Sequence, residues 1–340
     1  MLISAVIPAR EAQATLGLLF GSLEASTRKP GEIILVDDGS STPLEPIAKA
    51  HGARVLRVDR SLGPAAARNL GAAHARGDVL LFLDADVAVH SGTIERLASA
   101  LESDPSLAAV IGSYDDAPGH TGFWSRYRNL LHAWTHQTAS PSASTFWGAC
   151  GAIRREAFNA VNGFPGAYQR PAIEDIELGN NLVRAGYRIR LDRQALVCHH
   201  KAWTFWSMAL TDVRDRAIPW TRLILRQRRM PNDLNLRRGQ RFTAPLALLL
   251  LVLLPTLQLG HALPRSLFGV AAVLYLARNW RFYSFLANSQ GLWFALRSVA
   301  PHWLYFVYSC LGFALGVGAY LAAGVPARVG AAGAPRESRP

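Results

Sequence analysis

The chain has 340 residues, half of them hydrophobic, and its formal net charge is +12. A chain of this length holds a large domain with residues to spare, so two units are expected. Residues 216–340 contain 15 arginines and only two acidic residues, whereas acidic and basic residues nearly balance in residues 1–215. The three cysteines are scattered, which predicts neither a disulfide framework nor a zinc site.

The first part of the chain alternates strand-like and helix-like segments. Strands are predicted at residues 2–8, 32–38, 53–59 and 78–84, and helices at residues 12–26, 43–52 and 63–77. This alternation is typical of an α/β domain in which helices cover both faces of a parallel sheet. Ligands of such sheets bind beyond the carboxyl ends of the strands. We therefore expect one crevice where three strands end in polar clusters, at Pro8 to Glu11, Asp37 to Ser40, and Asp84 to Asp86.

The residues that follow are less regular. They predict a helix at 123–137, a strand near 149–155, a helix at 173–186 and strand-like pieces at 187–191 and 195–200. Residues 203–229 are rich in Trp and Arg with amphipathic spacing, which is typical of a helix in a membrane interface. The first ten residues lack the basic start and cleavage site of a signal peptide, so the N-terminal domain is expected to stay in the cytoplasm.

Two runs without Asp, Glu, Lys or Arg are long enough to cross a bilayer: Phe242–Pro264 with 23 residues and Ser298–Ala327 with 30. Ser266–Ala277 is either a short span or half of a re-entrant hairpin, and the aromatic run Phe282–Leu296 is predicted to be interfacial. Arginines ahead of the first run mark a cytoplasmic membrane side and explain the basic charge without nucleic acid. The lack of these charged residues in the long runs argues against a transporter.

Asp84 and Asp86 follow an apolar strand with one residue between them. Two like charges at this spacing repel each other, and a hard cation such as Mg²⁺ or Mn²⁺ removes the repulsion. Such ions complete their coordination with substrate phosphates and water. The pair therefore predicts a metal and diphosphate site, and the alternative is a solvated loop with two acids.

Other polar residues admit two interpretations each. Asp37 and Asp38 either hold a nucleoside or form an ordinary Asp-Gly turn. Arg68 either reaches a base or phosphate or is a surface arginine. Glu174 and Asp175 begin a predicted helix, whose dipole favours carboxylates even without a catalytic role.

His132 and His136 are four residues apart on a predicted helix, a spacing that metals use. The glutamate of an H-E-x-x-H motif is not present between them. A second metal site is therefore not expected here, and a lid or a membrane-facing helix is the favoured interpretation.

Taken in order, five segments resemble the family 2 glycosyltransferases with the GT-A nucleotide-sugar fold. The segments are "AVIPAR", "ILVDDGSST", "GPAAARNLGAAHARGDVLLFLDADV", "GACGAIRREAFNAVNGF" and "EDIELGNNLVRAGYRI". The resemblance covers about residues 2–205. It implies a GT-A domain at 1–205, a basic interfacial segment at 206–241, two to four membrane segments at 242–324 and a disordered tail at 325–340.

The resemblance also implies roles by matching position. The donor side would hold Pro8, Asp37, Asp38, Arg68 and Asp84; the metal ligands would be Asp86, Asp84 and His199; and the acceptor side would hold Trp147, Gly148 and Glu174. Asp175 would be the catalytic base that takes a proton from the acceptor hydroxyl in an inverting displacement. His200 is a less favoured metal ligand than its neighbour His199. Mg²⁺ or Mn²⁺ would neutralise charge on the departing nucleoside diphosphate.

The implied activity is transfer of a sugar from a nucleotide-sugar, with UDP as the default. A lipid or lipid-linked acceptor at the cytoplasmic (inner) membrane is expected because the interfacial helix and the spans would hold the site against the bilayer. Two segments depart from the family pattern: "PAREAQ" replaces the usual P-x-x-N-E, and "NGFPGAY" lacks an acid found in relatives. The Q-x-x-R-W motif of processive synthases is missing, which favours a single transfer. The alternatives are a polyprenyl-phosphate glycosyltransferase, a transporter with a nucleotide-binding head and an inactive scaffold.

Overall fold

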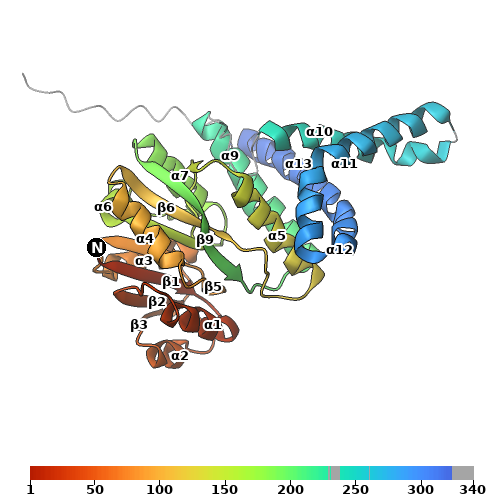
Figure 1. The fold of residues 1–340 in the computed structure, drawn as a ribbon. Coiled ribbons are helices and arrows are strands. Elements are labelled where there is room, and N and C mark those ends of the chain that lie inside the picture. Colours follow the sequence, from red (N-terminus) through yellow and green to blue (C-terminus); the bar gives the residue numbers. More distant parts are fainter. Residues whose placement is uncertain (229, 231–237, 260, 324–340) are drawn as a thin grey trace, which may run out of the picture.

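The structure is a computed structural model that describes residues 1–228, 230, 238–259 and 261–323. An α/β domain forms the N-terminal part, and helices that extend away from the domain form the C-terminal part (Figure 1). The tail predicted at 325–340 lies outside the described residues, as do residues 231–237 of the predicted interfacial segment.

A single nine-stranded sheet forms the centre of the α/β domain. Its strand order is β3 (Arg54–Val58), β2 (Glu32–Asp38), β1 (Ile3–Ala9), β4 (Val79–Leu83), β8 (Cys150–Arg154), β6 (Leu107–Tyr114), β9 (Arg188–His199) and β5 (Val87–Val89), and β7 (Ser142–Ala143) also pairs with β9. The first four strands in this order are parallel, as predicted. β8 is antiparallel to both its neighbours, so β6 and β9 again run in the direction of β4.

Helices cover both faces of the sheet, which confirms the predicted arrangement. One face packs against α1 (Gln13–Glu24), α2 (Glu45–Ala50) and α4 (Thr93–Ser103), and the other against α3 (Pro64–His74), α6 (Arg155–Ala160) and α7 (Glu174–Arg184). Strand β1 shows why both faces are apolar: Ile3 and Ile7 belong to the first hydrophobic cluster, and Val6 belongs to the second. Successive side chains of a strand point to opposite faces, so a strand buried on both faces has a continuous apolar sequence.

The structure differs from the sequence prediction in the middle of the domain. No element was predicted between residues 85 and 122, yet this stretch forms β5, α4 and the fully buried central strand β6. The two strand-like pieces at 187–191 and 195–200 are one strand, β9, whose pairing with β6 contains a register shift between Ile111 and Ser113. The shift lets a twelve-residue strand bend along β6 without ending.

The interfacial helix predicted at 203–229 is a continuous helical segment with an unusual centre. It consists of α8 (Phe205–Leu210), the π-helix η1 (Thr211–Ala217) and α9 (Ile218–Gln227). Pro219 lies in the first turn of α9 and has no backbone N–H, so it removes a hydrogen bond that an uninterrupted α-helix would need. The wider turn of a π-helix often occurs at functional sites.

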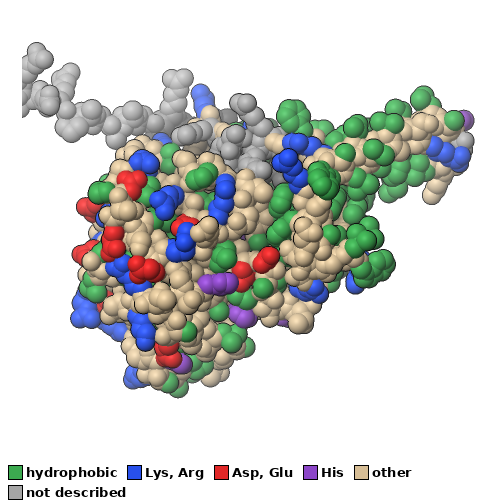
Figure 2. Space-filling model, viewed as in Figure 1, with side chains coloured by type: hydrophobic (Ala, Val, Ile, Leu, Met, Phe, Trp, Pro, Cys, Tyr) green, Lys and Arg blue, Asp and Glu red, His purple; other side chains and the backbone are tan. Residues whose placement is uncertain are grey.

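The C-terminal part consists of α10 (Arg238–Leu253), the 3₁₀-helix η3 (Pro255–Leu259), α11 (Ala262–Gln290), α12 (Leu292–Arg297) and α13 (Val299–Ala322). Arg241–Gln258 and Leu292–Ala322 are long and apolar enough to cross a membrane, which matches the two long uncharged runs. Hydrophobic side chains cover the projecting helices (Figure 2). The two shorter runs are not separate elements, because Ser266–Ala277 and most of Phe282–Leu296 belong to the single helix α11.

Candidate active site

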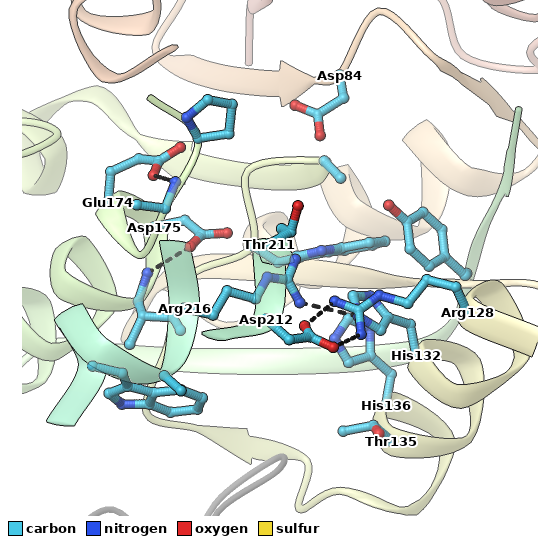
Figure 3. A pocket seen from close by; sticks show the side chains of 18 of the residues that line it. Asp84, Arg128, His132, Thr135, His136, Glu174, Asp175, Thr211, Asp212 and Arg216 are labelled. Carbon is cyan, nitrogen blue, oxygen red and sulfur yellow. Dashed lines mark hydrogen bonds and ion pairs between the residues drawn. The ribbon is translucent and has the colours of Figure 1, made fainter. Parts of the chain in front are cut away.

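A cavity of about 290 Å³ lies where the sheet meets the C-terminal helices. Its walls come from the ends of β4, β6 and β9, from α5 (Phe123–Thr138), from the start of α7 and from η1, α9 and α13. Figure 3 shows Asp84, Glu174 and Asp175 in one part of the cavity, and Arg128, His132 and His136 in another. Seven predicted site residues line it: Arg68, Asp84, Asp86, Trp147, Glu174, Asp175 and His199.

The predicted metal ligands meet at one wall of this cavity. Asp86 Oδ1 lies 3.6 Å from His199 Nε2, because Val87 pairs with His199 across β5 and β9. Burial disfavours the charged form of Asp86, but the nearby His199 and Lys201 outweigh it and lower the pKa of Asp86. Asp86 Oδ1 is buried and has no hydrogen-bond partner among the described residues. A buried carboxylate oxygen without a hydrogen bond is costly, and its negative charge suits a cation.

His199, rather than His200, lies beside Asp86. The His200 backbone N–H donates to the Asp86 carbonyl at 2.8 Å, while its ring packs against Gly119. Among the described residues, no three His, Cys, Asp or Glu side chains are grouped closely enough to form a metal site by themselves. The predicted ligand set is therefore not assembled as a closed cluster, and an ion here would need ligands from a substrate or water.

Arg68 links the metal side of the cavity to α7. Its Nη2 donates to Asp84 Oδ1 at 2.7 Å, and its Nη1 donates to Glu174 Oε1 at 3.0 Å. Burial opposes the charge of Arg68, but Asp84 and Glu174 outweigh burial and raise its pKa further. A Cβ at Gly148 would lie 3.0 Å from the Arg68 Cζ, so glycine leaves room for this guanidinium. Glu174 is buried and held by Arg68 and by the Ala172 N–H, and its predicted acceptor role stays a prediction.

Asp175 occupies the first turn of α7, at the cavity wall. Its Oδ2 accepts a hydrogen bond from the Gly148 N–H at 3.3 Å, and its Oδ1 accepts one from the Ile176 N–H at 2.8 Å. Burial and the neighbouring Glu174 raise the pKa of Asp175 to about 6. A carboxylate whose pKa lies near neutral is suited to take a proton from an acceptor hydroxyl.

The predicted donor residues Pro8, Asp37 and Asp38 do not line this cavity. They lie at the carboxyl ends of β1 and β2. Asp37 is fully buried and accepts from Arg57 Nη1 at 2.6 Å, and Asp38 accepts from the Gly63 N–H at 3.1 Å. Asp37 also accepts from the Ser40 N–H within its own turn, as the turn interpretation expects, whereas Asp38 holds residues 61–63 of the loop before α3. Their contact with a donor stays a prediction.

Tyr114 lines the cavity but was not predicted as a site residue. It ends β6, and its ring stacks on His199 with centroids 4.5 Å apart and lies 5.8 Å from His132. It also meets Trp147 edge-on at 4.8 Å, which fixes the ring of this predicted acceptor residue. The polar end of the apolar stretch "LAAVIGSYDD" is the signal that points to Tyr114, because β6 ends at the same edge of the sheet as β4.

Charged residues on the helices were also missed. Arg128 on α5 donates two hydrogen bonds to Asp212 on η1, at 2.7 and 2.5 Å, and both side chains are buried. Arg216, one π-helical turn later, has its Nη1 3.0 Å from His132 Nε2. Burial, Arg128 and Arg216 lower the pKa of His132 well below its usual value, so this ring is neutral. His132 and His136 both line the cavity, and the interpretation of α5 as a lid or a membrane-facing helix stays a prediction.

Comparison with known proteins gives two family matches. Residues 4–161 match the family described as glycosyl transferase family 2, and residues 128–199 match the N-terminal domain of galactosyltransferase. The pre-mycofactocin glycosyltransferase of Mycobacterium tuberculosis is 32% identical over 215 residues, which are 58% of this chain and 42% of that protein. The chain thus spans less than half the length of this relative.

A second relative and one solved structure are also glycosyltransferases. The N-acetylglucosaminyl-diphospho-decaprenol L-rhamnosyltransferase of M. tuberculosis is 29% identical over 216 residues, which cover 53% of this chain and 70% of that protein. The structure of the mannosyltransferase PcManGT from Pyrobaculum calidifontis, in complex with GDP-Man and Mn²⁺, shares the fold with a TM-score of 0.59 and 16% identity. It covers 92% of this chain and 86% of that chain. Residues 4–161 therefore contain a glycosyl transferase family 2 domain, which makes up slightly less than half of the chain.

Proposed function

We propose that this chain is a membrane-attached, inverting glycosyltransferase that moves a sugar from a nucleotide-sugar to a lipid or lipid-linked acceptor. One observation carries the proposal. Asp84, Asp86 and Asp175 line the same cavity, whose other walls include α9 and the candidate span α13. A donor held at the aspartates and an acceptor arriving along the helices would meet beside Asp175.

Asp175 acts as the general base in this proposal. It accepts the proton of the acceptor hydroxyl while that oxygen forms a bond to the anomeric carbon. The bond from this carbon to the diphosphate oxygen breaks, and its electron pair leaves with the nucleoside diphosphate. With a pKa of about 6, Asp175 is ionised at neutral pH and remains basic enough to accept the proton. A single displacement of this kind inverts the anomeric configuration.

Asp86, Asp84 and His199 are the residues that would hold Mg²⁺ or Mn²⁺. Two carboxylates and an imidazole are a suitable donor set, and the buried, unpartnered Oδ1 of Asp86 fits a cation. When bound, the ion supplies positive charge that neutralises the departing diphosphate. The Mn²⁺ and GDP-Man in the PcManGT complex support this assignment by analogy of fold. Pro8, Asp37, Asp38, Arg68 and Asp84 are the proposed donor side, with UDP as the default nucleotide.

The acceptor is proposed to be a lipid because of where the cavity lies. The two candidate spans and the exposed apolar side chains of α10, α11 and α13 favour a multi-pass protein of the cytoplasmic membrane, with its catalytic domain in the cytoplasm. The lipid-linked acceptor in the name of the M. tuberculosis rhamnosyltransferase supports this choice. A polyprenyl-phosphate glycosyltransferase is the second candidate, favoured by the cations Arg216 and Lys201 in the cavity wall. An acid-labile phosphosugar product would distinguish it from a stable glycolipid.

The test of the proposed function is metal-dependent turnover of nucleotide-sugars by the purified full-length chain in detergent. UDP-sugars and GDP-sugars are incubated with and without Mn²⁺, and release of nucleoside diphosphate is measured with lipid extract as acceptor. Asp175→Asn should lower kcat by about 100-fold or more, since general bases contribute about 10²–10⁴-fold. Glu177→Gln, on the same helix but outside the cavity, is the matched control and should change kcat less than about threefold.

Asp86→Ala tests the metal side in the same assay. This variant should lose the donor turnover that Mn²⁺ stimulates. Asp116→Ala, in an exposed loop, should retain that turnover. The proposal fails if every nucleotide-sugar is left intact with metal present. It also fails, for the acceptor, if a soluble acceptor is glycosylated well while lipid extracts are ignored.

A further inference from the structure

The cavity wall contains positive charge that the chain itself does not neutralise. Of the four lysine and arginine side chains that line it, Arg68 pairs with Asp84 and Glu174, and Arg128 pairs with Asp212. Lys201 and Arg216 form no ion pair with a carboxylate among the described residues, and Lys201 instead lies 4.8 Å from the centroid of the Trp203 ring.

Arg216 retains most of its hydrogen-bonding capacity. Its one described partner is His132 Nε2, at 3.0 Å, and a guanidinium has five N–H donors. His132 is neutral, so its Nε2 accepts this hydrogen bond and adds no charge. Figure 3 shows Arg128, His132, Asp212 and Arg216 gathered together, with Asp175 on the other side of Arg216. Arg216 thus contacts α5 through His132, and its charge also acts on Asp175, whose pKa it lowers.

Further nitrogen donors in the same walls have no partner. Arg128 Nε, Trp203 Nε1 and Trp220 Nε1 are buried and make no hydrogen bond within the described residues. Arginine Nε and indole Nε1 only donate, so they need an acceptor atom that the chain does not supply. Leaving buried donors unpaired is costly, and native structures seldom do so without a ligand or water. The wall is thus rich in donors and positive charge.

The wall on the side of the helices is apolar. Trp220 and Ile224 of α9 lie along it together with Tyr305 and Phe313 of α13, which is part of the candidate span Leu292–Ala322. A ligand that contacts both the positively charged wall and the apolar wall needs an anionic group with several hydrogen-bond acceptor atoms, and a hydrocarbon chain. A phosphorylated lipid has both features, and its phosphoryl oxygens match the fork of a guanidinium.

We propose that Arg216, with Arg128 Nε and the indoles of Trp203 and Trp220, forms a site for a phosphoryl group of the acceptor lipid, whose chain lies against α9 and α13. This site deepens the proposed function and rests on it, because it explains how an acceptor is held with its reacting oxygen near Asp175. The site consists of residues other than Asp84 and Asp86, which form the proposed metal and donor side of the same cavity.

The test measures lipid binding to the purified full-length chain in neutral detergent with EDTA, so that no divalent metal supports diphosphate binding. The probe is geranylgeranyl phosphate, and geranylgeraniol has the same chain without the phosphoryl group. Wild type should bind the phosphate about tenfold more tightly than the alcohol, or better, because charge-assisted hydrogen bonds are strong. Arg216→Gln should reduce this preference to about twofold or less, and Arg216→Lys should restore part of it.

Arg222→Gln is the matched control. Arg222 lies on α9 within two turns of Arg216 but does not line the cavity, so its variant should keep the wild-type preference. A thermal unfolding curve for each variant shows whether the protein is folded under the conditions of the binding assay. Folded Arg216→Gln that loses the preference, together with Arg222→Gln that keeps it, supports the site.

Four outcomes would overturn the proposal. They are equal binding of phosphate and alcohol by wild type, an unchanged preference in Arg216→Gln, competition by inorganic phosphate as strong as that by the lipid phosphate, and displacement of the lipid by a nucleotide-sugar in EDTA. The third would leave a simple anion site, and the fourth would assign the site to the donor. Donor turnover with Mn²⁺, measured on the same preparation, separates the two hypotheses: turnover without phosphate preference defeats only this site, and no turnover defeats the proposed function.

Discussion

At the scale of single residues, Asp175 and Asp86 both line one cavity, yet their surroundings shift their pKa values in opposite directions. Burial and Glu174 raise the pKa of Asp175 to about 6, whereas His199 and Lys201 overcome burial and lower the pKa of Asp86. Two titratable groups whose pKa values are pushed apart are suited to different roles. Asp86 remains charged for a cation, and Asp175 is able to exchange a proton.

The raised pKa of Asp175 predicts a pH profile. Only the ionised form accepts a proton, so kcat/KM should rise with pH through an apparent pKa of about 6 and level off above it. Measurement of kcat/KM for the acceptor between about pH 5 and 8.5 checks this, because kcat/KM reports groups of the free enzyme. The residual activity of Asp175→Asn should lack this rise with pH. If the variant shows the same rise, a group other than Asp175 causes the pH dependence.

The same shift has a consequence for stability. The folded state holds its proton on Asp175 up to a higher pH than the unfolded state, whose carboxyl has a pKa of 3.8. Between these two values the folded state binds more protons, so the contribution of this group to stability falls as the pH rises from roughly 4 to 6. Asp175→Asn should therefore raise the melting temperature relative to wild type at pH 7.5. The gain should shrink as the pH falls and disappear below about pH 3, where the wild-type carboxyl is protonated in both states.

At the scale of elements, the π-helix η1 connects the catalytic domain to the candidate span. Asp212 on η1 accepts hydrogen bonds from Arg128 on α5 and from the Tyr308 hydroxyl on α13, the latter at 3.0 Å. A buried charge that loses its partner is strongly destabilising, typically by about 3–5 kcal/mol. The packing of α5, η1 and α13 against one another therefore depends on the Asp212 carboxylate.

The Asp212 network predicts a loss of stability. Asp212→Asn should lower the free energy of unfolding by about 3 kcal/mol, because it leaves the Arg128 guanidinium buried without a counter-charge. Glu45→Gln, in the exposed pair with Lys49, is the control and should change it by less than about 0.5 kcal/mol. Thermal or denaturant unfolding of the variants in the same detergent measures both. Equal stability of Asp212→Asn and wild type would contradict this role.

Close packing between α13 and the η1–α9 segment is the second element-level feature. A Cβ at Gly312 would lie 2.6 Å from Ala217 Cβ, and one at Gly316 would lie 2.6 Å from Thr221 Cβ. Glycines four residues apart let two helices approach closely. Gly316→Val should destabilise the protein by about 1–3 kcal/mol, as overpacking does, and Gly318→Val, which meets nothing within 4 Å, should cost less. If the two variants melt alike, the helices are not held by this contact.

Some strands and side chains of the site could be predicted from the sequence, and others could not. β4 and its aspartates could be predicted, because a five-residue apolar run followed by acids is a strong local signal. β6 was missed, since "LAAVIGSY" includes alanine and glycine, which favour strands weakly. The contact of Asp86 with His199 depends on how β5 pairs with β9, a register that no local pattern specifies. Arg216 was missed as a site residue because the wider π-helical turn changes which side chains reach the cavity.

At the scale of the whole molecule, charge and hydrophobicity are separated along the chain. Residues 1–215 are nearly neutral and include the α/β domain, whereas residues 216–340 are strongly basic, and their described part carries most of the exposed large apolar side chains, on the C-terminal helices. Figure 2 shows this separation as a mixed surface on the domain and an apolar surface on the projecting helices. Exposed apolar area of this extent is typical of a surface that contacts a membrane or another protein.

The central claim is that this cavity transfers sugar from a nucleotide to a lipid. The most direct measurement places the purified full-length chain in lipid nanodiscs with Mn²⁺, radiolabelled UDP-sugars or GDP-sugars and a bacterial lipid extract, and counts the label in the organic phase. The account predicts label in the lipid fraction for wild type and Glu177→Gln, and about 100-fold less for Asp175→Asn. Label that stays in the aqueous phase with wild type, or that enters lipid equally with Asp175→Asn, would contradict it.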